Sequence, residues 1–581
     1  MATQQSSEFV KVGELDEIKE EERKVVRANG HTVVLFHHEG EVHAVDNRCP
    51  HMGFPLDKGT VKDGILTCDW HHARFELSCG DTFDPWADDV QTYPVEERDG
   101  EVWVNPNPEQ EESPEEHWKD RLSTGLQENI SLVMAKSVIG LFDEDVDYTV
   151  PLQIGTEFGS RYRESGWGSG LTIHSAMANI LDELEPKDQK RALYTGLRWV
   201  ADDCAGEPPK FNQRSFSTEE VPFDRLKSWF RETVEVRDQD GAERCLLTAV
   251  DNLPEERVAE ILFTAATDHL YLDTGHTFDF INKAFEVLDH IGWVHADLVL
   301  PTVIPQITNA TRSEETSQWR QPVDIAGMLF DTYDELPELV EEGEGKSWEE
   351  PDGFIETLLS DDPDEILSAL RTAIRNGATA EQLASRVTYA AIRRIVHFST
   401  ANEFNDWNTV HHTFSYLNAV HQATRRTSCT EIYRGVLDGA MSVYLDRFLN
   451  TPPVPIPDKN DTGRNPDEIL DDLTEAFDSE GEVNTAADLT AEYIDSGHDI
   501  GELKSTLGHT LLREDANFHT LQNVEASFRQ HELLDDPERK RNALIATTRY
   551  MSAHFPTRRE AEQTFTIASR LNRGEKIHES T

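Results

Sequence analysis

The sequence predicts a multidomain α+β protein, in which a small antiparallel β domain is followed by a large, mainly α-helical region. Near the N-terminus, short runs of β-branched and aromatic residues alternate with turn dipeptides such as Glu39-Gly40 and Asp99-Gly100. After residue 116 the pattern changes to long stretches with helical periodicity. Examples of these amphipathic stretches are 171–184, 258–272, 278–291, 380–398 and 410–423.

Two breaks divide the chain, which at 581 residues is too long for a single hydrophobic core. Residues 107–116 are rich in proline and glutamate and contain almost no apolar side chains, as is typical of a linker. Residues 450–465 hold four closely spaced prolines. The expected parts are a β domain (1–106), a linker (107–116), a helical domain that is a candidate for metal or substrate binding (117–449), a proline-rich linker (450–465) and a C-terminal helical region (466–581).

The charge balance excludes some classes of partner. The chain has 54 Lys and Arg residues against 110 Asp and Glu residues, a formal net charge of -56. Nucleic acids and anionic membranes are therefore not expected as partners. The acidic residues are dispersed among apolar periodic segments, which indicates a folded protein adapted to high salt, that is, a halophilic one.

Nothing in the sequence indicates a membrane or an oxidising compartment. Residues 1–8 lack a basic and apolar leader, and the apolar stretch 130–142 is short and interrupted by Lys136. Of the six cysteines, four are scattered without the spacing of a disulfide framework: Cys79, Cys204, Cys245 and Cys429. We expect a cytoplasmic protein in a reducing compartment.

The remaining two cysteines belong to a motif with metal-ligand spacing. Cys49-Pro50-His51 is followed after sixteen residues by Cys68-Asp69-Trp70-His71, which gives C-x-H-x16-C-x2-H. Two thiolates and two imidazoles can also bind zinc, but zinc modules usually pair C-x2-C with H-x3-H. Here each loop offers one Cys and one His, which favours a two-iron cluster with the cysteines on one iron and the histidines on the other.

The motif and the short strands around it resemble the Rieske [2Fe-2S] family over roughly the first hundred residues. The resemblance implies a [2Fe-2S] cluster bound by Cys49, His51, Cys68 and His71 and a role in electron transfer. Respiratory Rieske proteins add one cysteine to each loop, where this chain has Phe54 and Trp70, so it is similar to the ferredoxin and oxygenase type. That type implies an electron-donating reductase or ferredoxin as partner.

One position departs from the family pattern. Glycine usually follows the second histidine ligand, whereas here His72 follows His71. The C-x2-H spacing favours His71 as the ligand, and His72 is the lesser alternative. The turn at Gly80-Asp81 resembles the family's continuation after the second loop, and Pro85 is expected in the proline-containing loop that shields the cluster.

The helical region does not carry the second motif of Rieske oxygenases, a mononuclear iron held by two histidines and one carboxylate. The nearest fragment, Asp273 to His276, lacks a second histidine four or five residues later. Histidines and carboxylates do gather in two places, and the candidates for a second metal site are His269, Asp273, His276, His411 and His412. The alternative is that these side chains have ordinary structural roles and that Gly275 breaks the helix.

These observations lead to two functional hypotheses. In the first, the protein is an oxidoreductase whose cluster passes electrons to the fused helical domain, where an additional iron supports oxygenase-like activity on a small organic substrate. In the second, it is a ferredoxin-like electron carrier or redox sensor whose helical region only binds a partner protein. The iron content per chain discriminates between them, because the carrier needs only two irons.

Overall fold

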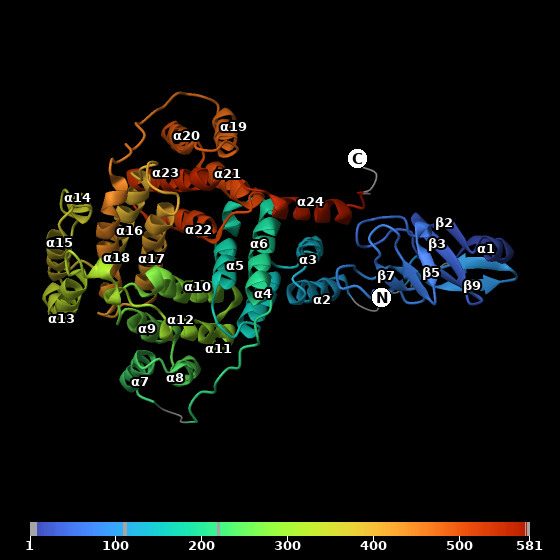
Figure 1. Ribbon diagram of the computed structural model, residues 1–581, viewed down its shortest axis with the longest axis horizontal. Coiled ribbons are helices and arrows are strands. Elements are labelled where there is room, and N and C mark those ends of the chain that lie inside the picture. The colour runs from blue at the N-terminus through green and yellow to red at the C-terminus, as the bar shows by residue number, and fades with distance from the viewer. Residues whose placement is uncertain (1–8, 109–112, 218–220, 576, 578–581) are drawn as a thin grey trace. The chain divides into compact units, whose positions relative to one another are not determined.

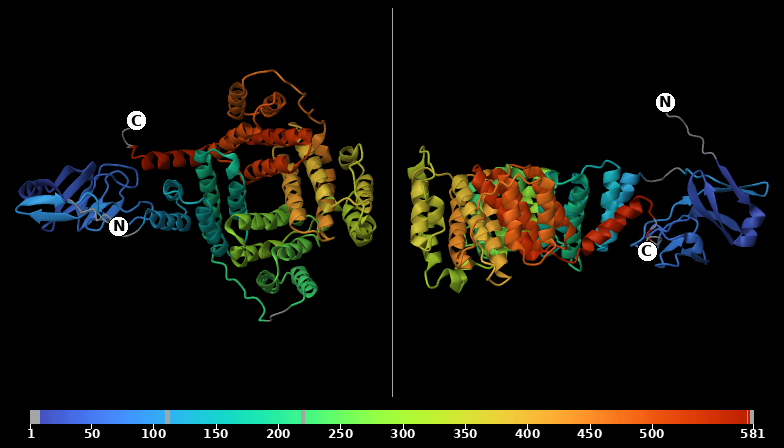
Figure 2. Two further views of the ribbon diagram at one scale, coloured as in Figure 1. Left: turned by 180° about the vertical axis from the view of Figure 1, so that it is seen from behind. Right: turned by 90° about the horizontal axis from the view of Figure 1, so that it is seen from above.

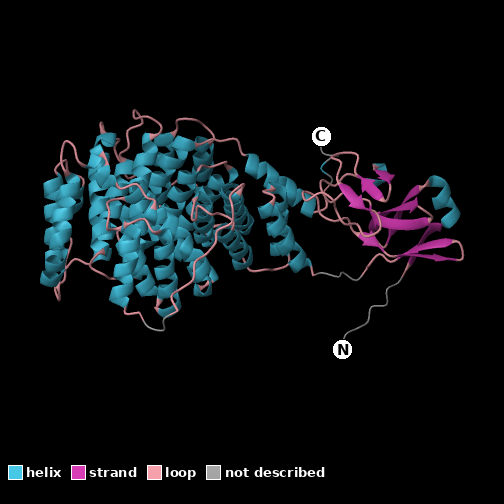
Figure 3. Cartoon of the chain, turned by 60° about the horizontal axis from the view of Figure 1, so that its bottom comes forward, coloured by secondary structure: helices cyan, strands magenta, loops and turns pink. Residues whose placement is uncertain are grey.

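The computed structural model describes residues 9–108, 113–217, 221–575 and 577. The chain forms two compact units, Met1–Ile154 with Ala561–Thr581 and Gly155–Glu560. Strands occur in the first unit, and the rest of the described chain is mainly helical, which confirms the predicted fold class (Figure 3). The N-terminal segment 1–8 and residues 109–112 of the expected linker lie outside the described residues.

Three antiparallel sheets build the β domain (Figure 1). The first contains β1 (Val10–Glu14), β10 (Glu101–Val104) and β9 (Val95–Arg98) in that order. The second has the order β2 (Arg23–Ala28), β3 (His31–His38), β4 (Glu41–Asp46) and β8 (Thr92–Tyr93). The third contains β5 (Thr60–Lys62), β6 (Ile65–Thr67) and β7 (Arg74–Glu76), and helix α1 (Leu15–Glu21) follows β1.

The turn dipeptides seen in the sequence form the hairpins of these sheets. Glu39 and Gly40 join β3 to β4 with φ angles of 52° and 96°. Asp99 and Gly100 join β9 to β10 with φ angles of 52° and 84°. Two successive residues with positive φ are typical of type I′ turns, whose twist matches that of paired strands.

The β domain has two hydrophobic cores. One is built from strand residues such as Val33, Leu35 and Val102. The other contains Leu66 and Phe75 and also holds both motif cysteines, which are buried. The candidate metal ligands are thus part of a packed core rather than of a mobile surface loop.

Three helices complete the first unit. Helices α2 (Pro114–Gln127) and α3 (Ser131–Asp143) pack against each other. Helix α24 (Glu560–Asn572), red in Figure 2, leads to the C-terminal residues that contact the β domain. The contact is made by Arg48, whose Nη2 donates to the carbonyl oxygens of Leu571 at 2.8 Å and Glu575 at 3.1 Å.

The second unit is a helical body. In chain order its principal helices are α4 (Thr149–Arg161, shared with the first unit), α5 (Ser169–Asn179), α6 (Pro186–Cys204), α7 (Phe223–Glu235), α8 (Gln239–Asn252), α9 (Glu255–Ala266), α10 (His276–Ile291), α11 (Ala296–Val299), α12 (Ile304–Thr308), α13 (Ile325–Gly343), α14 (Phe354–Leu358), α15 (Pro363–Arg375), α16 (Ala380–Val396), α17 (Asp406–Arg426), α18 (Ile432–Leu445), α19 (Pro466–Phe477), α20 (Val483–Asp495), α21 (Ile500–Arg513), α22 (Phe518–Leu533) and α23 (Pro537–His554). Helices α5, α10, α17 and α22 contact one another in a closed ring (Figure 1). No helix within the described ranges is long and apolar enough to cross a bilayer.

The segment 258–272 differs from the sequence-based expectation of one helix. Helix α9 ends at Ala266, and α10 begins only at His276. Between them Tyr271, Asp273 and Thr274 have φ angles of 44°, 47° and 56°. Left-handed backbone cannot continue an α-helix, so the helical periodicity of this stretch is interrupted.

Candidate metal centres

The two halves of the motif form loops with the same hydrogen-bond pattern. In loop 1, residues 49–54, the amide of Cys49 donates to the Phe54 carbonyl and the amide of Gly53 donates to the Cys49 carbonyl, both at 2.8 Å. In loop 2, residues 68–73, the amide of Cys68 donates to the Ala73 carbonyl at 2.8 Å, and the amide of His72 donates to the Cys68 carbonyl at 2.9 Å. Each loop therefore returns on itself and presents a cysteine at its start.

The departure at His72 has a structural explanation. His72 occupies the position in loop 2 that Gly53 has in loop 1, and their φ angles are 66° and 76°. Left-handed backbone favours glycine, but histidine is among the side chains that tolerate it. The His72 side chain is exposed.

The four motif side chains converge between the loops. Cys49 and Cys68 are 2% and 1% exposed. The rings of His51 and His71 lie 5.0 Å apart, nearly perpendicular at 84°, with His71 exposed. Among the described residues, the buried Nδ1 of His51 has no hydrogen-bond partner. The thiols thus lie inside and one imidazole reaches the surface, an arrangement that could hold a two-iron cluster with its histidine side toward solvent.

The electrostatics of this site suit metal ligands. Burial lowers the pKa of His51 to about 4 and also lowers that of His71, so both imidazoles are neutral at pH 7. The hydrogen bond that the Cys49 thiol donates to Cys68 lowers the pKa of Cys68 to about 6, and the same contact, together with burial, raises the pKa of Cys49. Two neutral imidazoles and one readily formed thiolate are thus present, and the second thiol loses its proton when iron binds.

A third loop covers loop 1. Trp86 packs edge-on against His51, with ring centroids 4.6 Å apart. Asp84 fixes this loop, because its carboxylate accepts a hydrogen bond from the Arg74 amide at 2.9 Å and pairs with the Arg74 guanidinium at 2.8 Å. Gly80 has a φ of 88°, and a Cβ there would lie 2.1 Å from the Val90 carbonyl, so glycine is required. The expected shielding loop thus has a rigid base.

A second group of potential ligands lies in the helical ring. His276 on α10, His412 on α17 and His519 on α22 offer ring nitrogens that all lie within 4.8 Å of one another. The Nε2 atoms of His412 and His519 are 2.9 Å apart. Burial lowers the pKa of His276 and His519 to about 4 and that of His412 to about 2. All three rings are neutral at pH 7 and have lone pairs for a metal.

The structure separates the other candidates from this group. Both ring nitrogens of His269 bind carboxylates, Glu314 at 2.7 Å and Glu235 at 2.6 Å. Burial opposes the charged form of His269, but these two hydrogen bonds outweigh it and raise its pKa. Asp273 instead accepts hydrogen bonds from the amide and hydroxyl of Thr311 at 2.8 and 2.7 Å. These contacts stabilise the left-handed segment that precedes α10.

His411 lies beside the group without belonging to it. Its ring is fully buried and its Nδ1 is 3.2 Å from the Asn523 amide nitrogen, while its Nε2 has no partner among the described residues. The ring centroids of His411 and His519 are 5.3 Å apart. His411 thus packs against the group but is not one of the three residues whose ring nitrogens converge.

His519 is not among the ligands predicted from the sequence, although the sequence contains a weak signal for it. His276, His412 and His519 are each followed by threonine and, six residues later, by a buried polar residue. These residues are Asn282, Asn418 and Glu525. The pattern H-T-x4-[N/E] occurs at these three places in the chain, but its irregular spacing hides it from a search for fixed-period repeats.

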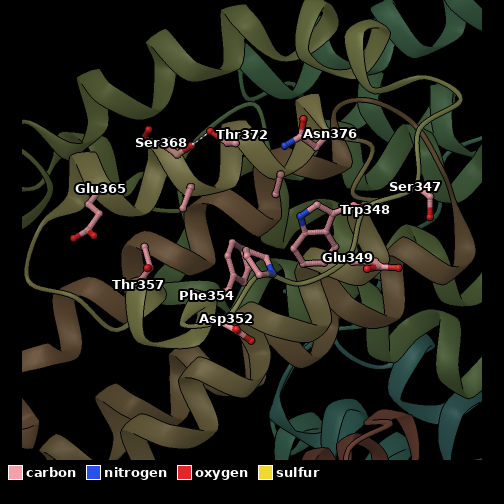
Figure 4. Close-up of a pocket in the computed structure, with 13 residues that line it drawn as sticks. Ser347, Trp348, Glu349, Asp352, Phe354, Thr357, Glu365, Ser368, Thr372 and Asn376 are labelled. Carbon is pink, nitrogen blue, oxygen red and sulfur yellow. Dashed lines mark hydrogen bonds between the residues drawn. The ribbon is translucent and has the colours of Figure 1, made fainter.

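A surface pocket of about 610 Å³ lies elsewhere in the helical body (Figure 4). Trp348 and Phe354 line it, with ring centroids 5.4 Å apart, and Thr372 of α15 and Asn376, the residue after this helix, lie on its other side. None of the candidate metal ligands lines this pocket. It gives no support to either centre.

Comparison with known proteins locates the family match in the β domain. Residues 8–94 match the model of the Rieske [2Fe-2S] domain. The ferredoxin component of an alkene monooxygenase system from Xanthobacter autotrophicus is 32% identical over 108 residues, which is 88% of that protein and 18% of this chain. The 4beta-methylsterol monooxygenase of Methylococcus capsulatus is 36% identical over 114 residues, 31% of that protein and 17% of this chain. The solved ferredoxin of carbazole 1,9a-dioxygenase from Nocardioides aromaticivorans IC177 is 27% identical and aligns over its whole length and 17% of this chain, with a TM-score of 0.17.

Proposed function

Because the chain belongs to the family of proteins with a Rieske [2Fe-2S] domain, we propose that loops 1 and 2 hold the cluster and that it supplies electrons to a second metal centre in the helical region. The proposed cluster ligands are Cys49, His51, Cys68 and His71. The proposed ligands of the second metal are His276, His412 and His519. The protein is then an oxidoreductase that combines an electron carrier with a reaction centre.

The relatives support the first half of this proposal. The Rieske domain is homologous to the ferredoxin component of a monooxygenase system, and its function is electron transfer. One relative is the ferredoxin component of a monooxygenase system and another is a monooxygenase, and we propose a reductase or ferredoxin as the electron donor of this protein. The family match ends at residue 94, and the role of the helical region rests on its own residues.

The convergence of three neutral histidines from three helices is the observation that carries the second half. Imidazole ligands suit iron, copper, nickel and zinc. Zinc has no redox chemistry, so it cannot accept electrons from the Rieske cluster. We therefore propose iron at the three histidines, with oxygen or a small organic substrate as a further ligand.

Iron and sulfide analysis of the whole chain tests both halves. Protein purified without oxygen in high salt should contain three irons and two acid-labile sulfides per chain and give a Rieske electron paramagnetic resonance signal after reduction with dithionite. Two irons with a normal Rieske signal would contradict the second centre and favour the carrier or sensor. Absence of labile sulfide would contradict the cluster itself.

Matched variants assign the third iron to its ligands. His412→Gln should lose one iron and keep the Rieske signal, because α17 retains its fold while the metal loses a ligand. His421→Gln changes another buried histidine of α17, which hydrogen-bonds Gln530 at 2.9 Å, and should keep all three irons. Equal iron loss in both variants would show that the effect comes from packing in α17 and not from ligation.

The setting of the protein is part of the same proposal. The net charge of -56 and the six cysteines, none of which is in a disulfide, fit a reducing cytoplasm with high salt. Neither nucleic acid nor membrane is proposed as a partner, since a strongly acidic surface repels both.

A further inference from the structure

A buried group of three charged side chains joins the β domain to α2 and α3 within the first unit. Asp88 is 8% exposed and lies in the loop that carries Trp86. Its carboxylate pairs with Arg121 of α2 at 2.8 Å and with the ammonium group of Lys136 of α3. Two cations therefore face one carboxylate, and this group of three side chains carries a net positive charge.

Lys136 and Arg121 also donate hydrogen bonds to backbone carbonyl oxygens beside the proposed Rieske cluster. Lys136 Nζ donates to the carbonyl of Pro50, the residue before His51 in loop 1, at 3.0 Å. Arg121 donates to the carbonyls of Pro85 and Ala87 at 2.9 and 3.1 Å, on either side of Trp86. Because Trp86 packs against His51, both cations brace segments that border this histidine.

Lys136 stands out already in the sequence, because it interrupts the apolar stretch 130–142 that forms α3. The Lys136 side chain is only 12% exposed, so its ammonium group loses most of its hydration and must be stabilised by a nearby negative charge. Asp88 supplies the compensating charge, but it is shared with Arg121. A residual positive charge thus remains next to loop 1.

We propose that Lys136 is a positioning residue of the Rieske cluster, which holds loop 1 in place and raises the reduction potential of the cluster. This inference rests on the cluster proposed above but not on the second metal. Reduction adds one electron to the cluster without making or breaking a bond, and a nearby positive charge stabilises the added negative charge. Because Lys136 is largely buried, water and salt screen this attraction far less than they would at the surface.

Redox titration of the full-length protein tests the proposal. In Lys136→Met the ratio of reduced to oxidised cluster at a fixed potential should fall about three- to tenfold, and a tenfold change corresponds to about 59 mV for a one-electron couple. Lys136→Arg keeps the charge and should restore most of the ratio. Asp88→Asn removes the negative charge and should raise the ratio of reduced to oxidised cluster. A general loss of packing would shift the ratio in the same direction in both variants.

The control is Lys119→Met on α2. Lys119 is paired with Glu115 at 2.7 Å and Glu116 at 2.9 Å. Lys119→Met should leave the reduction potential of the Rieske cluster unchanged. An unchanged potential in Lys136→Met, or an equal shift in Lys119→Met, would overturn the inference while the Rieske signal still supports the cluster. Absence of that signal in the unaltered protein would instead contradict the cluster proposal.

Discussion

His412 and His519 face each other through their Nε2 atoms at 2.9 Å, although 107 residues separate them in the chain. Without a metal, one ring must donate its proton to the other, which fixes opposite tautomers for the two histidines. With a metal, both nitrogens turn their lone pairs to the same ion. Metal binding therefore requires the donating ring to move its proton from Nε2 to Nδ1.

Cobalt substitution tests whether the three histidines bind a metal. We expect Co²⁺ bound there to show visible absorption bands that depend on its imidazole ligands. His519→Gln should lose these bands, while His421→Gln should keep them. Equal bands in His519→Gln and the unaltered protein would contradict the three-histidine site.

Replacement of His72 by glycine separates the two neighbouring histidines of loop 2. We expect His72→Gly to keep the Rieske signal and to raise the free energy of unfolding by about 0.5 kcal/mol, since glycine relieves a left-handed residue but gains entropy in the unfolded chain. His71→Ala should lose the cluster. Thermal loss of visible absorbance measures the first effect and sulfide content the second, and cluster loss in His72→Gly would make His72 the ligand.

Asp438 gives the helical body a pH dependence. This fully buried carboxyl accepts a hydrogen bond from the Tyr333 hydroxyl, and burial raises its pKa from 3.8 to about 8. The folded chain keeps a proton that the unfolded chain releases above pH 3.8, so the stability from this group is full below pH 3.8 and is lost as the pH rises through about 8. Asp438→Asn, which carries no charge, should therefore weaken the loss of stability between about pH 4 and 8.

Urea denaturation followed by circular dichroism in high salt checks this expectation. Asp361→Asn is the matched control, because the Asp361 side chain is 89% exposed and should leave the pH profile unchanged. A parallel pH profile for Asp438→Asn and the unaltered protein would mean that Asp438 is ionised in the folded state.

Arg48 ties loop 1 to the C-terminal segment. We expect Arg48→Ala to release its hydrogen bonds to the carbonyls of Leu571 and Glu575 and to expose the side of loop 1 at Gly53. Loss of the cluster in air, followed by the decay of visible absorbance, should then be several times faster. Arg98→Ala removes an arginine paired with Glu96 on β9 and should leave the decay rate unchanged.

The acidic surface predicts a requirement for salt. Lowering NaCl from about 2 M to about 0.1 M lengthens the Debye length from a few ångströms to about 10 Å, so repulsion among the carboxylates of this chain increases. We expect the thermal midpoint to fall across this range and sucrose to restore little of it. An unchanged midpoint would contradict adaptation to high salt.

The β domain and its cluster loops could be predicted because their determinants are local. The turn dipeptides Glu39-Gly40 and Asp99-Gly100 occupy the left-handed positions of hairpins, and the C-x-H and C-x2-H fragments each lie within a single loop. Helical periodicity likewise located most of α10, α16 and α17. It failed at 258–272, because left-handed residues interrupt the helix without changing the spacing of apolar residues.

By itself, the sequence determined the fold class, the family resemblance and the residues that offer two thiolates and two imidazoles, since these depend on spacing along a few neighbouring residues. Only the tertiary structure decided that His519 joins His276 and His412, that Lys136 lies against Pro50, and that the C-terminal segment returns to Arg48. These contacts join residues far apart in the chain. Their pairing depends on how helix faces pack, which neither composition nor periodicity encodes.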